Sequence, residues 1–396
     1  MSETVSVQVR VISSLNLVEP AKWDACANPE GEVYNPFLRH AFLLAMEESG
    51  SATAETGWLG QHLILENEAD EVLAVMPLYL KDHSQGEYIF DYGWADAFHR
   101  AGGHYYPKLL SAVPFTPAGG RRLLVKPGPH HDEHKNQLLA AALTLLKKLD
   151  ASSLHINFLP EEDWETLGTQ GFLQRTDQQF HWQNEGYQSF EAFLDAMASR
   201  KRKNLRKERA KALENGIEIE ALTGDQLTEE HWDAFFHFYV DTGHRKWGTP
   251  YLTRDFFTRI QQTMPEDTLL IMAKREGRYI AGALNFIGGD TLYGRNWGCL
   301  EDHPFLHFEV CYYQAIDFAI ARGLARVEAG AQGTHKLARG YAPHRTYSSH
   351  YITHEGLRQA VGDYLETERQ YVDNDMKALS QHTPFKKADP TGETDD

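Results

Sequence analysis

The stretch LLIMAKREGRYIAGALNFI, residues 269–287, predicts a β-hairpin, because two apolar runs flank a polar turn at 275–278. A strand rich in aromatic residues is predicted next, over 291–300. The segment 305–322 carries apolar residues at helical spacing, and Gly323 follows it as a typical helix stop. Hairpin, strand and helix in this order are the beginning of an α/β unit.

The unit ends with a strand at 325–329, where apolar residues alternate with Arg326 and Glu328. The same order of elements occurs earlier in the chain. There a hairpin is predicted over 62–80, a strand at 122–125, a helix at 135–149 and a strand at 154–158. Two copies of one unit predict an α/β protein built from tandem repeats of weak mutual identity.

The two copies differ in the connection between hairpin and helix. In the second copy this connection is short, whereas in the first it covers 81–134 and is rich in aromatic residues, Gly and Pro. A long loop of this kind is usually functional or disordered, and this one is too aromatic for disorder. We expect it either to wall a substrate cleft or to pack on the sheet.

These features divide the chain into three parts. A first domain is expected at 1–175 and includes the insertion at 81–134. A second domain is expected at 176–380, and it opens with a basic helix at 198–214. The polar and acidic segment 381–396 is expected to be a disordered tail.

The composition excludes several classes of protein. The chain has 396 residues and a net charge of −17, from 39 basic and 56 acidic side chains, which argues against a DNA-coating protein. No apolar run approaches the ~18 residues of a membrane span, and the first residues lack the pattern of a secretory signal. Three irregularly spaced cysteines (Cys26, Cys299, Cys311) do not suit a disulfide framework or a cysteine zinc site. We therefore expect a cytoplasmic protein without a transmembrane segment.

The segment 198–211 is the exception to the acidic composition, with eight basic residues and one acid. It is followed by Asn215-Gly216, a pair typical of helix ends. One interpretation is a solvated helix face. The other is an electrostatic dock for a phosphate-bearing ligand, and tRNA is one partner of that kind.

The same basic segment resembles part of a known family. Residues 200–209, RKRKNLRKER, are similar to the basic helix that opens the second domain of the Fem family of peptidoglycan-branching aminoacyltransferases. That family pairs two GNAT-like acyltransferase domains. The resemblance implies the same architecture here, an α/β (α+β) fold in which each domain is a mixed sheet flanked by helices.

A second stretch is more specific. Residues 327–343, VEAGAQGTHKLARGYAP, followed by TYSSH at 346–350, resemble a bacterial branch of predicted N-acyltransferases described as peptidoglycan-biosynthesis-like. The sequences NPFL at 35–38 and FDYGW at 90–94 match the same branch. The resemblance covers residues 10–375 and implies an N-acyltransferase.

The chain departs from acetyl-CoA enzymes of this fold in the loop before the central helix. Those enzymes hold the pyrophosphate of CoA in a glycine-rich loop at the helix N-terminus. The corresponding segments here, 127–134 and 300–307, lack the glycine cradle and bring acidic residues. No cofactor is therefore assigned, and the donor is left open between an acyl-CoA and an aminoacyl-tRNA. The histidines of these segments are not arranged as metal ligands, and no metal is expected.

Polar residues cluster after the strand 325–329, at the end of the sheet where open α/β folds usually bind ligands. The predicted catalytic residues are Glu328 or His335 as the base and Lys336 as a group that binds a phosphate or carboxylate. The alternative is a structural salt bridge from Glu328 to Lys336 or Arg339. The predicted substrate-binding residues are Gln332, Arg339 and Tyr341 in the same loop, Arg295 and Trp297 on the preceding strand, Asp91, Tyr92 and Trp94 in the insertion, and Arg245 and Lys246 in the loop at 242–250. For Arg245 and Lys246 the alternative interpretation is a solvated loop without a binding role.

No motif for a nucleophilic residue is evident, so acyl transfer is expected to proceed by direct attack of an amine with acid/base assistance. The leading hypothesis is a cytoplasmic N-acyltransferase with a small-molecule amine acceptor and a cleft between its two domains. The second hypothesis is a non-catalytic metabolite-binding protein on a duplicated acyltransferase scaffold. A third is an acyl-CoA enzyme that holds its cofactor unconventionally.

Overall fold

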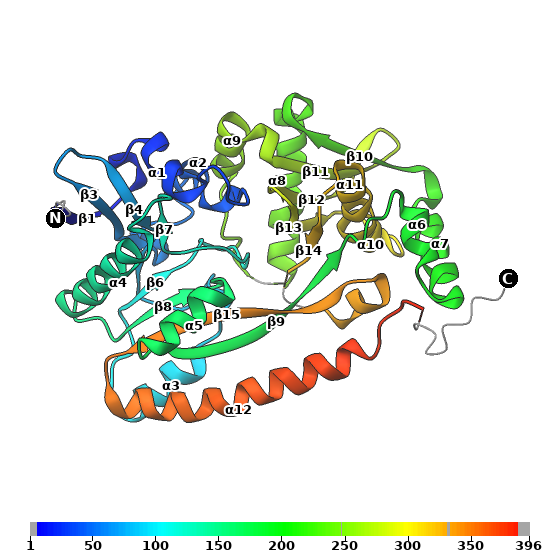
Figure 1. Ribbon diagram of the computed structural model, residues 1–396. Coiled ribbons are helices and arrows are strands. Elements are labelled where there is room, and N and C mark those ends of the chain that lie inside the picture. The colour runs from blue at the N-terminus through cyan, green and yellow to red at the C-terminus, as the bar shows by residue number, and fades with distance from the viewer. Residues whose placement is uncertain (1–5, 247, 331–332, 387–396) are drawn as a thin grey trace.

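The computed structural model describes residues 6–246, 248–330 and 333–386. It is a mixed α/β structure in which helices cover two β-sheets (Figure 1). Residues 6–172 form one half of the molecule and residues 184–330 the other. Two long strands and a long helix connect the halves. The predicted fold class is confirmed.

The smaller sheet belongs to the first half. Its strands are antiparallel and lie in the order β1 (Val7–Ile12), β3 (His62–Asn67), β4 (Val72–Met76) and β7 (Leu124–Val125). Helices α1 (Pro20–Ala27) and α4 (His131–Lys148) pack against it, and α2 (His40–Glu48) lies beside α1. The predicted hairpin at 62–80 is present as β3 and β4.

The larger sheet runs through the whole molecule. In the first half it contains β2 (Leu59–Gly60), β5 (Tyr79–Lys81), β6 (Lys108–Ser111) and β8 (Ser153–Asn157). The connecting strands β15 (Ala342–Ile352) and β9 (Leu173–Gln183) follow. The second half adds β14 (Arg326–Glu328), β13 (Thr291–Cys299), β12 (Arg278–Ile287), β11 (Thr268–Arg275) and β10 (Ile217–Thr223).

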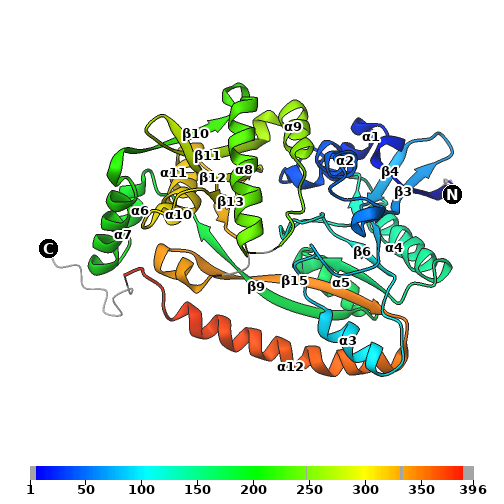
Figure 2. The same ribbon diagram turned by 180° about the vertical axis from the view of Figure 1, so that it is seen from behind.

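The remaining helices surround these sheets. The first half carries α3 (Tyr92–Arg100) and α5 (Glu161–Thr169). The second half carries α6 (Phe190–Asp195), α7 (Ser199–Ala212), α8 (Glu229–Lys246), α9 (Arg254–Thr263), α10 (Leu306–Phe308) and α11 (Gln314–Arg322). The last helix, α12 (Glu355–Ser380), runs along β9 and β15 and so spans both halves (Figure 2).

The hairpin and helix of the second copy form as predicted, with one irregularity. Strands β11 and β12 pair in antiparallel fashion around the turn at 276–277. The predicted helix at 305–322 is divided into α10, a π-helical turn over Glu309–Tyr313, and α11. Gly323 ends α11 with a φ of 68°, the left-handed conformation that glycine adopts most readily.

The two halves exchange one strand each. In the first half β6 runs parallel to β8, and in the second half β13 runs parallel to β14. Strand β9, which follows β8 in the chain, pairs with β14 of the second half. Strand β15, which follows β14, pairs with β8 of the first half. Both exchanged strands also pair with each other, which fastens the halves together. The expected domain boundary at residue 175 falls inside β9.

The insertion at 81–134 is not the long loop that was expected. It contains α3 and the strand β6, which supplies the parallel partner of β8. The predicted strand at 122–125 forms only as β7, which pairs with β4 in the other sheet. Strand β6 was not predicted because its surroundings are aromatic and polar and because it begins with Lys108. Lys108 is buried, which is rare for a charged residue and is not expected from the sequence.

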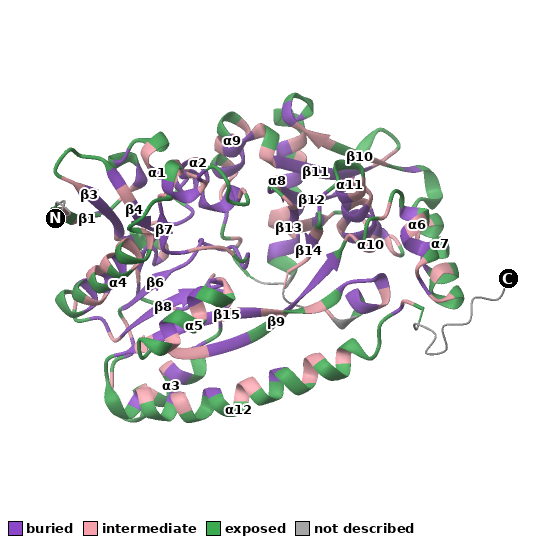
Figure 3. Ribbon diagram, viewed as in Figure 1, coloured by how far each residue is buried: buried purple, intermediate pink, exposed green. Residues whose placement is uncertain are grey.

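An apolar core joins the halves above the exchanged strands. The ring of Phe37 lies 5.2 Å from that of Phe286 and 5.0 Å from that of Tyr293, and Phe42 lies 5.8 Å from Phe256. Buried residues follow the strands, whereas the outer face of α12 is exposed (Figure 3). Edge-to-face aromatic packing of this kind adds to the burial of apolar surface and stabilises the junction. Within the described ranges, no helix combines the length and apolar character needed to cross a bilayer.

Candidate functional site

A pocket of about 600 Å³ opens at the junction of the two halves. The first half contributes residues near 27–38, 119–121 and 158–161, and the connecting strands contribute residues of β9 and β15. The second half contributes four side chains: Asp290, Tyr293, Arg326 and Glu328. The pocket therefore lies where the leading hypothesis places the cleft.

Glu328 occupies the end of β14, aligned with Tyr293 of β13 on one side and with His181 of β9 on the other. Its side chain is buried, with the residue 8% exposed. Desolvation raises the pKa of Glu328 to about 7, against the charges of Arg326 and Arg295, which lower it. Glu328 lines the pocket, and in the described parts of the chain no hydrogen bond to its carboxylate is found. The carboxyl group is therefore available to a substrate in the pocket.

His181 is the closest basic side chain to that carboxyl group, with Nε2 3.9 Å from Oε2 of Glu328. Its ring stacks on His344 of β15 with the ring centres 4.2 Å apart. Burial, assisted by the nearby charges of His344 and Arg326, lowers the pKa of His181 well below its usual range. The imidazole is therefore neutral at physiological pH.

Gln179 orients His181. Its side-chain NH₂ group donates to the carbonyl oxygen of Pro117 at 2.7 Å. The amide oxygen is therefore left to accept from Nε2 of His181, at 3.3 Å. This places the proton of the neutral imidazole on the nitrogen nearest Glu328.

The arginines around the pocket already have acidic partners. Arg326 pairs with Asp290 at 2.7 Å, and Arg345 pairs with Asp373 at 2.7 Å. Arg121 lies 3.9 Å from Glu32. Their charges are therefore partly compensated, and Glu328 is a carboxyl group of the pocket whose pKa lies near neutrality.

The loop after β14 does not join Glu328 in the pocket. Lys336 is buried, and its Nζ donates to the carbonyl oxygens of Ala329 at 2.5 Å and Gly330 at 3.1 Å. Burial lowers the pKa of Lys336 to about 8. Lys336 thus ties the loop back to the end of β14, and the salt bridge to Glu328 that was the alternative reading does not form.

The other residues predicted in that loop are spread over several environments. Arg339 pairs with Glu208 of α7 at 2.8 Å, and the ring of His335 accepts or donates a hydrogen bond with Tyr312 at 3.0 Å. Tyr341 is buried in the core of the second half. Gln332 lies outside the described residues.

The two residues predicted on β13 lie on its pocket-distant part. Arg295 is held by the carbonyl oxygen of Phe115 in the first half. Trp297 is half-buried and packs edge-to-face on His307, with ring centres 5.1 Å apart. Arg245 and Lys246 were expected in a loop, but α8 continues to Lys246; Arg245 lies in the last turn of this helix and pairs with Asp241 at 2.6 Å, and the side chain of Lys246 lies outside the described part of the chain.

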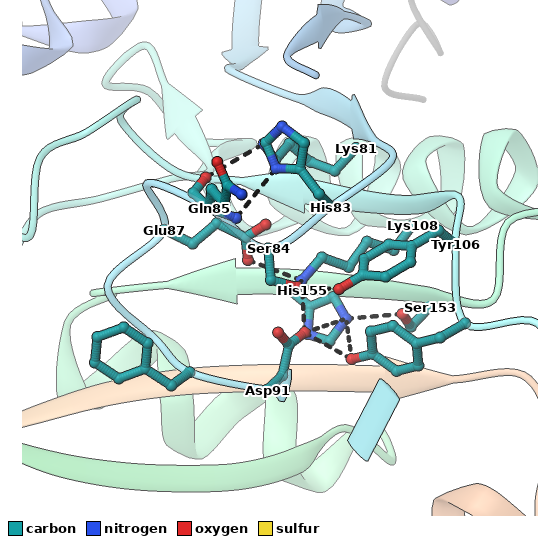
Figure 4. A network of polar contacts seen from close by, with 12 residues as sticks. Lys81, His83, Ser84, Gln85, Glu87, Asp91, Tyr106, Lys108, Ser153 and His155 are labelled. Atoms are coloured by element: carbon teal, nitrogen blue, oxygen red, sulfur yellow. Dashed lines mark hydrogen bonds and ion pairs between the residues drawn. The ribbon is translucent and has the colours of Figure 1, made fainter. Parts of the chain in front are cut away.

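The three residues predicted in the insertion, Asp91, Tyr92 and Trp94, lie apart from the pocket, although Gly119, Gly120 and Arg121 of the same insertion line it. Asp91 precedes α3 and is buried with Lys108 in a closed network of polar contacts (Figure 4). Trp94 is buried against His155, whereas Tyr92 is exposed.

His181 and Gln179 are two of the pocket residues that sequence reasoning missed. A signal was present, because buried Phe180 and Trp182 alternate with His181 along the chain. The alternation indicates a strand, but it does not reveal that this strand crosses to the other half. Across the residues that the structure describes, no group of three or more His, Cys, Asp or Glu side chains is arranged to hold a metal ion.

The chain matches the family model FemAB-like, described as peptidoglycan biosynthesis/recognition, over residues 14–387. Among solved structures it resembles FemX, with 14% identity, a TM-score of 0.55, and coverage of 87% of this chain and 98% of that one. A conserved protein of unknown function from Bacteroides thetaiotaomicron has 11% identity, a TM-score of 0.53, and coverage of 88% and 100%. The C-terminal domain of a putative lysylphosphatidylglycerol synthetase from Agrobacterium fabrum has 8% identity, a TM-score of 0.52, and coverage of 88% and 95%. At these identities the likeness is one of fold. No curated protein matches the chain.

Proposed function

The chain belongs to the FemAB-like family of peptidoglycan biosynthesis and recognition, and we propose that it is an N-acyltransferase whose reaction takes place in the pocket between its halves. The observation that carries the proposal is Glu328, a buried carboxyl group that faces this pocket, has no hydrogen-bond partner in the described chain and has a pKa raised to about 7 by desolvation. A base with a pKa near the working pH is the efficient choice for removing a proton from an attacking amine.

The reaction is direct transfer. The amine nitrogen of the acceptor attacks the acyl carbonyl carbon, a C–N bond forms, and the amine proton passes to Glu328. The bond from the carbonyl carbon to the donor then breaks, and the donor takes up the proton held by Glu328 and leaves as a thiol or an alcohol, which restores the carboxylate. Holding the reactants together in the pocket is worth about 7–11 kcal/mol, and a positioned base adds about 10²–10⁴-fold.

His181 assists by orientation. The hydrogen bonds from Gln179 to Pro117 and from His181 to Gln179 place the imidazole proton of His181 on Nε2. His181 can therefore donate a hydrogen bond to the Glu328 carboxylate when the 3.9 Å distance between Nε2 and Oε2 shortens around a substrate. Such a donor stabilises the charged form of the base. His344 supports the ring of His181 from the other face.

We propose that the basic helix α7 binds the phosphates of the acyl donor. Three of its arginines hold the helix to the body of the protein through Asp195 at 2.9 Å, Glu191 at 2.5 Å and Glu309 at 2.8 Å. The cations that remain exposed and without an ion pair in the described structure are Arg200, Lys201, Lys203, Lys207 and Lys211. Both an acyl-CoA and an aminoacyl-tRNA carry phosphates, and α7 lies at the outer side of the second half (Figure 1). A patch this far out favours the larger donor, aminoacyl-tRNA.

The second candidate is a metabolite-binding protein without catalysis. It is favoured by the segments 127–134 and 300–307, which bring acidic residues to the helix beginnings where an acyl-CoA enzyme of this fold has a glycine cradle. Ligand binding without product from any thioester or aminoacyl donor is the outcome that supports this candidate.

The test compares two carboxamide variants. The protein is incubated with charged tRNA or acyl-CoA and candidate amines, and products are identified by mass spectrometry; a molecule that co-purifies from the host guides the choice of substrates. We expect Glu328→Gln to slow transfer by about 100-fold or more. Glu71→Gln, which alters an exposed carboxylate 2.5 Å from Lys126, serves as the control and leaves the rate unchanged. Full turnover by Glu328→Gln on an identified substrate rejects the role of Glu328.

A further inference from the structure

Arg295 belongs to β13 of the second half, but the first half holds its guanidinium group. Its Nη2 donates to the carbonyl oxygen of Phe115. Tyr293, two residues earlier on β13, is aligned with Glu328 of β14. Arg295 lies close enough for its charge to oppose the desolvation that raises the pKa of Glu328. A cation beside the pocket carboxyl group is therefore fixed across the junction of the halves.

Phe115 has a backbone conformation that must be held by its surroundings. Its φ is 54°, a left-handed value that bulky residues rarely adopt. Tyr251 stacks on its ring at 4.7 Å, and Trp58 packs on it edge-to-face at 5.2 Å. A Cβ atom at Gly86 would lie 2.4 Å from the Phe115 ring, so the backbone at Gly86 packs directly on this ring. The carbonyl that holds Arg295 thus depends on the segment around residue 86.

That segment is anchored by one buried ammonium group. Nζ of Lys108 donates to Ser84 at 2.8 Å, to Glu87 at 2.8 Å and to Asp91 at 2.5 Å (Figure 4). We call these four residues the Lys108 cluster. Tyr105 donates a further hydrogen bond to Asp91 at 2.7 Å. Because the cluster holds the segment 84–91 near its start, in its middle and at its end, the segment has little freedom to move.

Tyr88 lies between the anchored Glu87 and Asp91, and it makes the second link to Arg295. Its φ is 59°, again a left-handed value for a bulky residue. Desolvation lowers the pKa of Arg295, and the interaction with Tyr88, which includes a hydrogen bond, opposes this. Tyr88 and Phe115 of the first half therefore both contact the same guanidinium group of the second half.

We propose that Arg295 is a positioning residue for Glu328 and that the Lys108 cluster holds Arg295 in place by fixing the segment 84–91. A fixed cation favours the ionised, proton-accepting form of the carboxyl group. The inference rests on the proposed function for the catalytic meaning of Glu328. Its physical content, the titration of Glu328, is measurable without any substrate.

The charged and titratable groups that face Glu328 come from four directions. They are His181 on β9, His344 on β15, Arg326 on β14 itself, and, from the side of β13, Asp290, Tyr293 and Arg295. Asp290 pairs with Arg326. Arg295 has no acidic partner within ion-pair distance in the described structure, and its charge lowers the pKa of Glu328, though less than the charge of Arg326 does.

The experiment follows the Glu328 carboxyl carbon by NMR titration of the full chain with ¹³C-labelled glutamate, assigned by its loss in Glu328→Gln. We expect Arg295→Gln to raise the pKa of Glu328, because it removes a charge that lowers that pKa, and Arg295→Lys to restore part of the shift. Gly86→Ala, which displaces the Phe115 ring, is expected to raise the same pKa by less. Lys126→Met, which removes an exposed cation of the first half, is the control and leaves the titration unchanged.

Each outcome decides part of the proposal. An unchanged Glu328 titration in folded Arg295→Gln overturns the role of Arg295. If Arg295→Gln does not fold, Tyr88→Phe, which removes only the phenol oxygen, is measured in its place. A shift in Arg295→Gln without any shift in Gly86→Ala overturns the role of the Lys108 cluster. If the shifts occur but no transfer is found with any donor, the proposed function fails and the electrostatic link stands. If transfer is found, its pH profile in Arg295→Gln is expected to move to higher pH by the same amount as the titration.

Discussion

His350 of β15 is aligned with His155 of β8, and their Nδ1 atoms lie 2.6 Å apart. The second half has the equivalent pair, because His181 of the exchanged strand β9 is aligned with Glu328 of β14. In both halves, an exchanged strand thus brings a histidine to a titratable residue on the strand that follows the central helix. The pair in the second half faces the pocket, whereas Trp94 closes the pair in the first half, with its ring centre 5.1 Å from that of His350. We infer that the duplicated scaffold has two copies of one polar position and that only one is open.

This difference predicts that His350→Ala destabilises the protein without altering the pocket. His350 is fully buried, and its loss leaves a void and removes the partner of the His155 Nδ1 atom. We expect a loss of about 2–3 kcal/mol in the free energy of unfolding, measured by urea denaturation. The titration of Glu328 is expected to be unchanged. His130→Ala, at an exposed site, is the control with no loss of stability. A changed Glu328 titration in folded His350→Ala would contradict the independence of the two positions.

Glu328→Gln is expected to change how stability depends on pH. The pKa of Glu328 is about 7 in the folded protein and about 4.5 in the unfolded chain, so the folded state keeps its proton longer. Rising pH therefore destabilises the wild-type protein between about 4.5 and 7, and the full cost of about 3 kcal/mol is present above pH 7. Glutamine does not titrate. The stability of Glu328→Gln relative to wild type should rise across this window and then level off.

The measurement is urea unfolding of both proteins at a series of pH values. Other groups with shifted pKa values, such as Glu87 and Lys81, cancel in the difference because both proteins contain them. A difference in stability that does not vary between pH 4.5 and 7 would show that Glu328 is not desolvated.

The sequence predicted local elements well because their signals are local. The hairpin at 269–287 and the stop at Gly323 follow from apolar periodicity and from backbone preference, and both are confirmed. The strand exchange has no such signal. It depends on which distant strand lies beside β14, and the pairing of β9 with β14 joins residues about 145 positions apart.

The candidate site was predictable only in part, for the same reason. Glu328 was identified because it lies in an alternating strand just before a turn. Lys336 and Arg339 were grouped with it because they are near in sequence, but hydrogen bonds to Ala329 and an ion pair to Glu208 occupy them. His181 was missed because it reaches the pocket only through the exchange of β9. Partners of charged side chains are set by tertiary contacts that periodicity does not encode.

The exposed cations of α7 are expected to contribute to donor binding. Lys203 and Lys207 lie four residues apart on one face of the helix. We expect Lys203→Ala/Lys207→Ala to weaken binding of tRNA by about 10-fold at low salt and to reduce the slope of log affinity against log salt by about 1–2. Fluorescence anisotropy of labelled tRNA measures both. The matched control replaces Lys147 and Lys148, two exposed lysines at the end of α4. Equal losses in both double variants would show that only the general charge of the protein matters.

Arg209 of the same helix is expected to behave in the opposite way. It pairs at 2.8 Å with Glu309, which is 0% exposed and opens the π-helical turn, and it lies 2.7 Å from Asp317. Replacing it by Met leaves the buried Glu309 carboxylate without its cation, so we expect Arg209→Met to lower the free energy of unfolding by about 3–5 kcal/mol. Arg200→Met, on the exposed side of the helix, is expected to change it by less than about 0.5 kcal/mol. Urea denaturation of both variants separates the two roles of the helix. If Arg209→Met is as stable as Arg200→Met, the inward arginines do not attach α7 to the π-helical turn.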